Sequence, residues 1–204
     1  IVTESVFSMD GDLADLRRLV ELKEKYDALL VVDEAHSVGV RGPRGTGLAA
    51  ELGVAGKVDV LIGTFGKAFG STGAYAIMEP EVRGFLINHM RSLIFTTGLP
   101  PVVLNWSNFV LRHAAGMDAE RAKLRRMGDR LRAIFTAAGA KTDGDSQIVP
   151  FMVGEDHDAE LMAEKFQSNG FLVFPIRPPT VPAHTSRLRF SLTAALDESD
   201  IEAV

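Results

Sequence analysis

Residues 28–36 have the sequence ALLVVDEAH, in which five apolar residues are followed by two acids and, after one alanine, an imidazole. The apolar run is short and does not alternate with polar residues, which is typical of a strand buried on both faces of a parallel sheet. Before it, Leu13, Leu16, Leu19 and Val20 recur at helical spacing, and Asp12 is placed to cap the first turn. We therefore predict an amphipathic helix that leads into this strand.

Two more apolar segments extend this pattern along the chain. Glycines and a proline between residues 42 and 47 indicate a loop, residues 48–52 a short helical turn, and residues 58–64 and 73–78 two further strands. Strands that alternate with helices predict an α/β fold, in which functional side chains lie at the carboxyl ends of the strands. The predicted fold class is α/β, with a mostly parallel sheet and helices packed on it.

The pattern changes after Pro100 and Pro101. A long helical region is expected from residue 102 to about 138, with a break or bend near Gly116. Further elements are expected at residues 147–153 (strand), 158–169 (helix), 171–174 (strand) and 188–192 (strand). This order is typical of a small α+β unit. We expect a domain boundary that separates residues 1–98 from residues 99–204.

The composition narrows the class of protein and of partner. The chain has 204 residues, with 22 Lys and Arg against 27 Asp and Glu, a formal net charge of −5, and no cysteine. The acidic balance argues against a nucleic-acid partner, and no apolar run reaches the roughly 20 residues that span a bilayer. Disulfides and thiolate metal sites are excluded. We expect a cytoplasmic location and, because the first residue is Ile1 rather than methionine, a fragment of a longer protein.

The first candidate site is the tetrapeptide DEAH at residues 33–36, directly after the predicted strand. In a helicase driven by nucleoside triphosphates, these residues would hold Mg²⁺ and activate water. A strand-end acid that caps the next turn is a second interpretation. The four residues alone do not decide between these interpretations and another catalytic role.

The second candidate is Lys67, which lies in the segment GTFGKAFG at residues 63–70. This segment lacks the spacing of a phosphate-binding P-loop, because Ala68 follows the lysine. One interpretation is a surface lysine in a glycine-rich loop. The other is a Schiff-base lysine, because apolar surroundings favour the neutral amine. Since Asp33 could keep a pyridine nitrogen protonated and Thr64 could offer a hydroxyl to a phosphate, pyridoxal phosphate suits these residues.

Five motifs in order carry a resemblance to a known family. They are SMDGD (residues 8–12), VDEAHSVG (32–39), TFGK (64–67), FTTGLPP (95–101) and RLR (187–189). With them the chain resembles the α-oxoamine synthases over essentially its whole length. The resemblance implies a fold-type I enzyme that uses pyridoxal 5'-phosphate (PLP) to condense an amino acid with an acyl thioester, and it disfavours the helicase interpretation. It also implies that residues 1–98 belong to a large cofactor domain and residues 99–204 to a small one.

The resemblance implies roles for individual residues. Lys67 is expected to bind the cofactor as a Schiff base and to move the Cα proton of the substrate, and Asp33 to pair with the pyridine nitrogen. His36 is expected to hydrogen-bond the phenolic oxygen of the cofactor and to assist catalysis, with Ser8 as a second neighbour of that oxygen. Thr64 is expected on the phosphate. The alternative for His36 is a structural core histidine.

Other implied contacts involve a second subunit and the substrates. Thr96 and Thr97 are expected to reach the phosphate of the partner subunit's cofactor, which implies a homodimer with shared active sites. Arg189 is expected to bind the amino-acid carboxylate, a task that suits a planar bidentate donor. A surface strand arginine is the alternative. Thr180 and Arg177 are expected to line the substrate site near the acyl chain.

Two carboxyl-terminal segments narrow the substrate class. IRPPTVP (residues 176–182) and SLTAA (residues 191–195) look most like the family member of the biotin pathway, which condenses L-alanine with a pimeloyl thioester of coenzyme A or acyl carrier protein and releases CO₂. The first alternative is a glycine-using synthase that forms 2-amino-3-oxobutyrate or 5-aminolevulinate. The second is a truncated module without activity.

Overall fold

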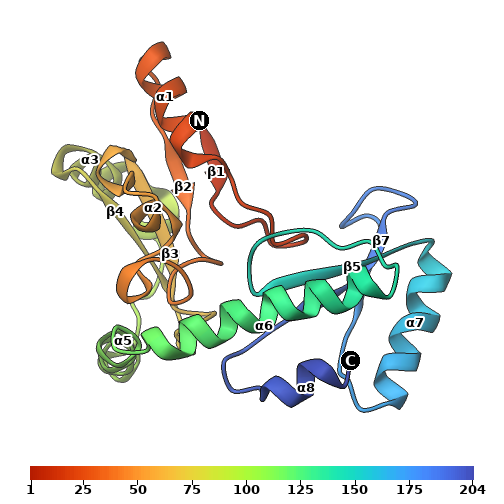
Figure 1. Ribbon diagram of the computed structural model, residues 1–204. Coiled ribbons are helices and arrows are strands. Elements are labelled where there is room, and N and C mark those ends of the chain that lie inside the picture. Colours follow the sequence, from red (N-terminus) through yellow and green to blue (C-terminus); the bar gives the residue numbers. More distant parts are fainter. The chain divides into compact units, whose positions relative to one another are not determined.

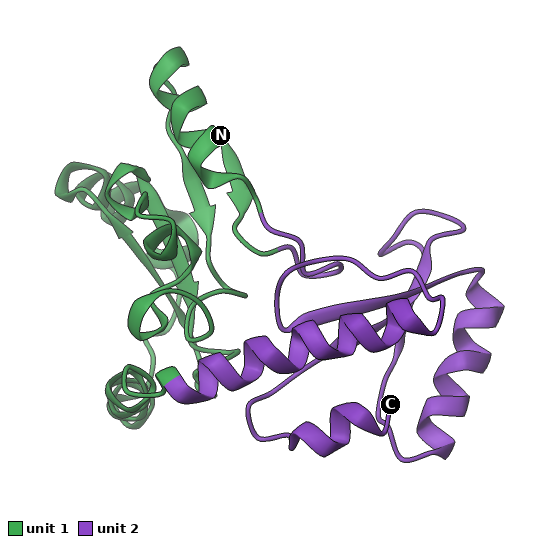
Figure 2. Ribbon diagram, in the orientation of Figure 1, with its two compact units in different colours: residues 1–6, 14–118 green, residues 7–13, 119–204 purple.

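The computed structural model describes residues 1–204, and the contacts between residues divide them into two units. Unit 1 comprises residues 1–6 and 14–118, and unit 2 comprises residues 7–13 and 119–204 (Figure 2). Residues 99–118 therefore pack with unit 1, although the sequence pattern groups them with the carboxyl-terminal part. The expected boundary between residues 98 and 99 concerns the domains of a whole protein and stays a prediction.

Unit 1 contains a four-stranded sheet (Figure 1). The strands lie in the order β1 (Val2–Glu4), β2 (Val31–Asp33), β3 (Val60–Thr64) and β4 (Ala74–Met78). The first three run parallel, whereas β4 pairs antiparallel with β3. The predicted α/β class with a mostly parallel sheet is confirmed. β2 is shorter than the apolar run that predicted it, because Leu29 lies before the strand and is 67% exposed.

The helices of unit 1 are α1 (Leu16–Tyr26), α2 (Leu48–Glu51), α3 (Pro80–His89), α4 (Arg91–Ile94) and α5 (Pro101–Ala114). The cap of α1 differs from the predicted one. Asp15, not Asp12, is the N-cap, and its side chain accepts a hydrogen bond from the Arg18 N–H. The Asp12 carbonyl instead accepts one from the Phe7 N–H within the loop of residues 7–13. The prediction failed because two acids three positions apart both suit a cap.

Asp59 links the last turn of α1 to the start of β2. Its carboxylate lies 2.6 Å from Lys23 Nζ and 2.7 Å from the Leu30 amide nitrogen. Although burial alone would raise the pKa of Asp59, Lys23 and the Leu30 N–H hold it below its ordinary value of 3.8. We expect Asp59→Ala to lower the free energy of unfolding by about 1–3 kcal/mol at neutral pH.

The lowered pKa of Asp59 also determines how the loss of stability in Asp59→Ala depends on pH. The contribution of Asp59 is complete above the unfolded pKa and disappears as the pH falls through the folded pKa. The urea unfolding curves of the wild type and of Asp59→Ala should therefore converge in acid. A difference that widens in acid would contradict the role assigned to Asp59.

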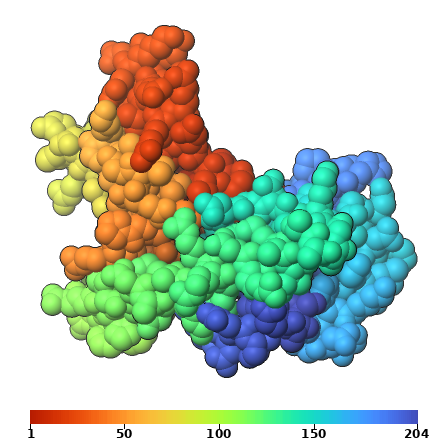
Figure 3. Space-filling view, in the orientation of Figure 1, coloured from red at the N-terminus to blue at the C-terminus, as the bar shows by residue number.

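Unit 2 is built on a three-stranded antiparallel sheet with the order β5 (Ile148–Gly154), β7 (Ser186–Ser191) and β6 (Pro175–Ile176). Its helices are α6 (Asp118–Ala137), α7 (Asp156–Ser168) and α8 (Glu198–Glu202). α5 ends at Ala114 and α6 begins at Asp118, which confirms the break expected near Gly116. One side of α6 packs into the core, where the Phe135 ring contacts Phe151 and Phe190. The other side of α6 is visible at the surface of unit 2 in Figure 3.

The prediction of a strand at residues 171–174 is wrong. Leu172 and Phe174 are 80% and 61% exposed, and Val173 is buried between them. The Val173 carbonyl accepts a hydrogen bond of 2.8 Å from Gln167 Nε2 of α7 rather than from a neighbouring strand. β6 therefore begins only at Pro175. None of the helices in the structure is long and apolar enough to cross a membrane.

Candidate active site

The predicted site residues are divided between the two units. Unit 1 holds Asp33, His36, Thr64, Lys67, Thr96 and Thr97. Unit 2 holds Ser8, Arg177, Thr180 and Arg189.

Asp33 ends β2 at the carboxyl edge of the parallel strands. Its Oδ1 atom accepts a hydrogen bond of 2.8 Å from the Ala35 N–H, and its Oδ2 atom accepts none within the chain. The register pairs Asp33 with Ile62 of β3, and the Glu34 N–H donates to the Ile62 carbonyl at 2.7 Å. Because Asp33 is half-buried and keeps an open acceptor, it is suited to receive a hydrogen bond from a ligand.

β3 carries Thr64 and Lys67 to the same sheet edge. Thr64 is the last residue of β3, and its hydroxyl donates a hydrogen bond of 3.2 Å to the Gly73 carbonyl. Lys67 is exposed and lies in a turn, which is closed by a hydrogen bond of 3.0 Å from the Gly70 N–H to the Lys67 carbonyl. Asp33, Thr64 and Lys67 therefore lie at or just beyond one edge of the sheet.

Three other predicted residues of unit 1 lie in segments that connect its helices and strands. His36 is half-buried in the turn that follows β2. Thr96 and Thr97 are exposed after α4, and their hydroxyls make no hydrogen bond within the chain. Their expected contact with a partner subunit stays a prediction.

Glu34 is a buried carboxylate that is not among the predicted site residues. It is 2% exposed and accepts hydrogen bonds from the Leu48 N–H (2.9 Å), the Ala49 N–H (2.7 Å), the Ser5 hydroxyl (3.2 Å) and the Ser37 hydroxyl. These donors come from three separate segments. Glu34 therefore fixes the turn that carries His36 against the start of α2. An acid at the end of an apolar strand was the signal that could have revealed it.

The structure predicts a large loss of stability when Glu34 is removed. In Glu34→Ala, two backbone N–H groups and two hydroxyls lose their buried acceptor, so we expect the free energy of unfolding to fall by about 2–4 kcal/mol. Burial raises the pKa of Glu34 above 4.5, and folding therefore takes up a proton. The loss should consequently shrink as the pH rises from 4.5 through the folded pKa. Urea unfolding of both proteins at several pH values measures it, and a loss that grows with pH would contradict the assignment.

In unit 2, Arg189 on β7 contacts the loop that carries Ser8. Arg189 Nε donates a hydrogen bond of 2.6 Å to the Ser8 carbonyl, whereas its two Nη atoms make none within the chain and the guanidinium forms no ion pair. Burial lowers the pKa of Arg189 because it disfavours the charged form. A half-buried arginine without a counter-ion is suited to bind a planar anion.

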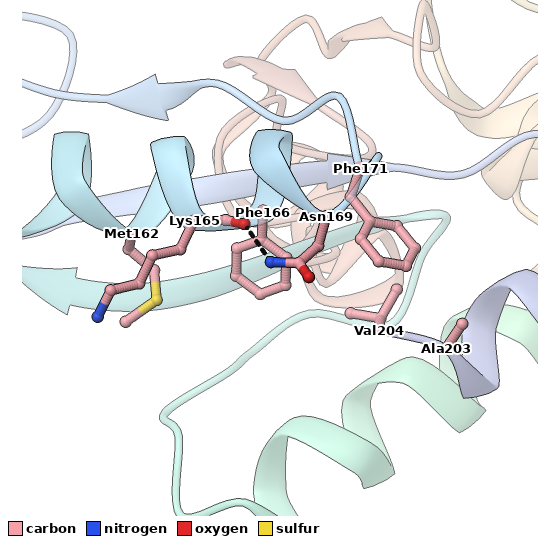
Figure 4. A pocket seen from close by; sticks show the side chains of 7 residues that line it. All are labelled: Met162, Lys165, Phe166, Asn169, Phe171, Ala203 and Val204. Carbon is pink, nitrogen blue, oxygen red and sulfur yellow. Dashed lines mark hydrogen bonds between the residues drawn. The ribbon is translucent and has the colours of Figure 1, made fainter.

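Arg177 and Thr180 share one turn after β6. The Thr180 N–H donates to the Arg177 carbonyl at 3.0 Å, and the Arg177 guanidinium pairs with Glu160 of α7. A hollow of about 430 Å³ lies elsewhere in unit 2, between α7 and the end of α8 (Figure 4). None of the predicted site residues lines it. The lining residues are Met162, Lys165, Phe166, Asn169, Phe171, Ala203 and Val204.

The comparison with known families covers the whole chain. Residues 1–204 match the family model of aminotransferase class I and II. The chain belongs to this family. This membership agrees with the resemblance carried by the five motifs and excludes the helicase interpretation of residues 33–36.

Within this family, the chain is similar to curated proteins of one name. It is 54% identical over 204 residues to the 8-amino-7-oxononanoate synthase of Chlorobaculum parvum, with 100% of this chain and 52% of the relative covered. It is 44% identical over 209 residues to the enzyme of the same name from Haemophilus ducreyi, with 100% of this chain and 54% of the relative covered. The chain therefore spans about half the length of these curated relatives.

Solved structures of family members share the fold. An 8-amino-7-oxononanoate synthase from Francisella tularensis matches with a TM-score of 0.88 and 28% identity, over 99% of this chain and 59% of that one. A serine palmitoyltransferase variant from S. paucimobilis, with a bound PLP–myriocin aldimine, matches with a TM-score of 0.92 and 32% identity, over 98% of this chain and 51% of that one.

Proposed function

We propose that this chain is part of a PLP-dependent acyltransferase that condenses L-alanine with a pimeloyl thioester, releases CO₂ and the free thiol, and forms 8-amino-7-oxononanoate. The curated relatives of that name support the choice of reaction. The observation that carries the proposal is the open Oδ2 atom of Asp33, at the sheet edge that also carries Lys67. A pyridine N–H needs such an acceptor, so the residues fit the cofactor.

The cofactor residues then have separate tasks. Asp33 holds the proton on the ring nitrogen, and Lys67 provides first the amine that holds the cofactor and later the base that takes the Cα proton of the substrate. His36 and Ser8 bind the phenolic oxygen, and Thr64 reaches the phosphate after its hydroxyl turns away from Gly73. When bound, PLP supplies an electron sink for the negative charge left at Cα.

The substrates and the second subunit complete the proposal. Arg189 binds the carboxylate of L-alanine through its two open Nη atoms, and Thr180 and Arg177 lie near the acyl chain. Thr96 and Thr97 reach the phosphate of the partner subunit's cofactor, so the active protein is a homodimer. The proposed location of the protein is the cytoplasm.

The test is substrate choice by the full-length protein. Purified protein loaded with PLP is given L-alanine, glycine or L-serine, each with pimeloyl, acetyl, succinyl or palmitoyl thioester, and release of free thiol and CO₂ is measured. We expect turnover with L-alanine and pimeloyl thioester above all other pairs. Preference for glycine would establish a glycine-using synthase, preference for L-serine with palmitoyl thioester a serine palmitoyltransferase, and no turnover with any pair an inactive protein.

A further inference from the structure

The loop of residues 7–13 is tightly packed in unit 2. A Cβ atom on Gly11 would lie 2.2 Å from the Ile148 carbonyl oxygen, and one on Gly144 would lie 2.3 Å from the Asp10 carbonyl oxygen. The Asp145 N–H also donates to the Gly11 carbonyl at 3.1 Å. Because neither Gly11 nor Gly144 has room for a side chain, the loop packs closely against β5 in a single arrangement.

Two arginines on β7 reach this loop. They are two residues apart, so both side chains project from the same face of the strand. Arg187 is 4% exposed and pairs with the Asp10 carboxylate, while its Nε and Nη2 atoms donate to the carbonyl (2.9 Å) and hydroxyl (3.2 Å) of Thr185. Arg187 is therefore neutralised and held from both sides.

Arg189 is held differently. Only its Nε atom is bound, by the Ser8 carbonyl, which fixes the direction of the guanidinium plane and leaves both Nη atoms open. Ser8 and Asp10 belong to the same short loop. The ion pair that anchors Asp10 therefore also fixes the carbonyl that orients Arg189.

We propose that the Asp10–Arg187 ion pair positions Arg189 to bind the carboxylate of the amino-acid substrate. The pair holds the loop where the Ser8 carbonyl meets Arg189 Nε. It also commits the Asp10 carboxylate to Arg187, so that Arg189 keeps no counter-ion of its own. This inference rests on the function proposed above, and it makes Asp10 and Arg187 positioning residues that do not touch the substrate.

The experiment compares an amino acid with an amine that lacks its carboxylate. L-Alanine and ethylamine are each titrated into the full-length PLP-loaded protein, and binding is followed by the change in cofactor absorbance and by calorimetry. In Asp10→Asn we expect L-alanine affinity to fall about tenfold to a hundredfold, because an ionic hydrogen-bond partner is lost, and ethylamine affinity to stay unchanged. Asp158→Asn is the matched control, since Asp158 is exposed on α7 of the same unit.

A second variant separates positioning from folding. Arg187→Lys keeps a positive charge beside Asp10 and loses the planar fork, so it should show a smaller, equally carboxylate-specific loss. Equal loss of both ligands, unchanged affinity for L-alanine in either folded variant, or failure of both variants to fold would overturn the inference. A wild-type protein that prefers no α-amino acid over ethylamine would overturn the proposed function as well, so the two failures are distinguishable.

Discussion

Lys67→Ala should reduce the turnover of the full-length protein at least about 10³-fold and remove the visible absorbance band of the lysine-bound cofactor. Both effects have one cause, since the proposal gives the Lys67 amine two tasks, to hold the cofactor and to take the Cα proton of the substrate. Absorbance spectra of the PLP-loaded proteins and the release of free thiol measure the two effects separately.

The matched control is Lys57→Ala. Lys57 is also exposed in unit 1, where it pairs with Glu24 at 3.0 Å, and its loss should leave both the band and the turnover unchanged. Borohydride reduction followed by mass analysis of peptides should then place the cofactor on the peptide that contains Lys67. If the cofactor is found on another lysine, or if the band survives in Lys67→Ala, Lys67 is not the attachment site.

The strand ends in unit 1 could be predicted from local patterns. β2 and β3 consist of apolar residues that stop at Asp33 and Thr64, and parallel strands bring such ends to one sheet edge. The exact start of β2 could not be predicted, because Leu29 and Leu30, which lie before the strand, have the same apolar character as Val31, with which it begins. Composition records hydrophobicity, whereas burial depends on what packs over each position.

Contacts between distant segments could not be predicted from such local patterns. Nothing local to residues 7–13 indicates that Asp10 pairs with Arg187 or that the Ser8 carbonyl meets Arg189, because these partners are 177 and 181 positions apart. The contacts of Glu34 could not be predicted for the same reason, since its backbone donors, Leu48 and Ala49, lie 14 and 15 residues further along the chain. Motif matching named the residues expected to touch ligands, and only the fold revealed the groups that hold them in place.

Asp33→Asn should lower turnover by about 10²–10³-fold and weaken PLP binding. The asparagine can keep the hydrogen bond from Ala35 through its oxygen, so the fold and the melting temperature should change little. Its amide nitrogen then occupies the place of Oδ2 and cannot accept a hydrogen bond from the ring nitrogen. Equilibrium dialysis against PLP and the thiol-release assay measure the two losses. Glu79→Gln is the control, because the exposed Glu79 makes no side-chain hydrogen bond at the start of α3.

A cofactor analogue isolates the Oδ2 interaction itself. When carbon replaces the ring nitrogen of PLP, the ring has no N–H that Asp33 can hold. The wild type should therefore bind the analogue more weakly than it binds PLP, and Asp33→Asn should bind the analogue as tightly as the wild type does. The ratio of wild-type to variant affinity should therefore fall from well above one with PLP to about one with the analogue. A ratio that stays the same for both cofactors would mean that Asp33 acts by supporting the turn at Ala35, and the open carboxylate oxygen at the end of β2 would then have no part in holding the ring.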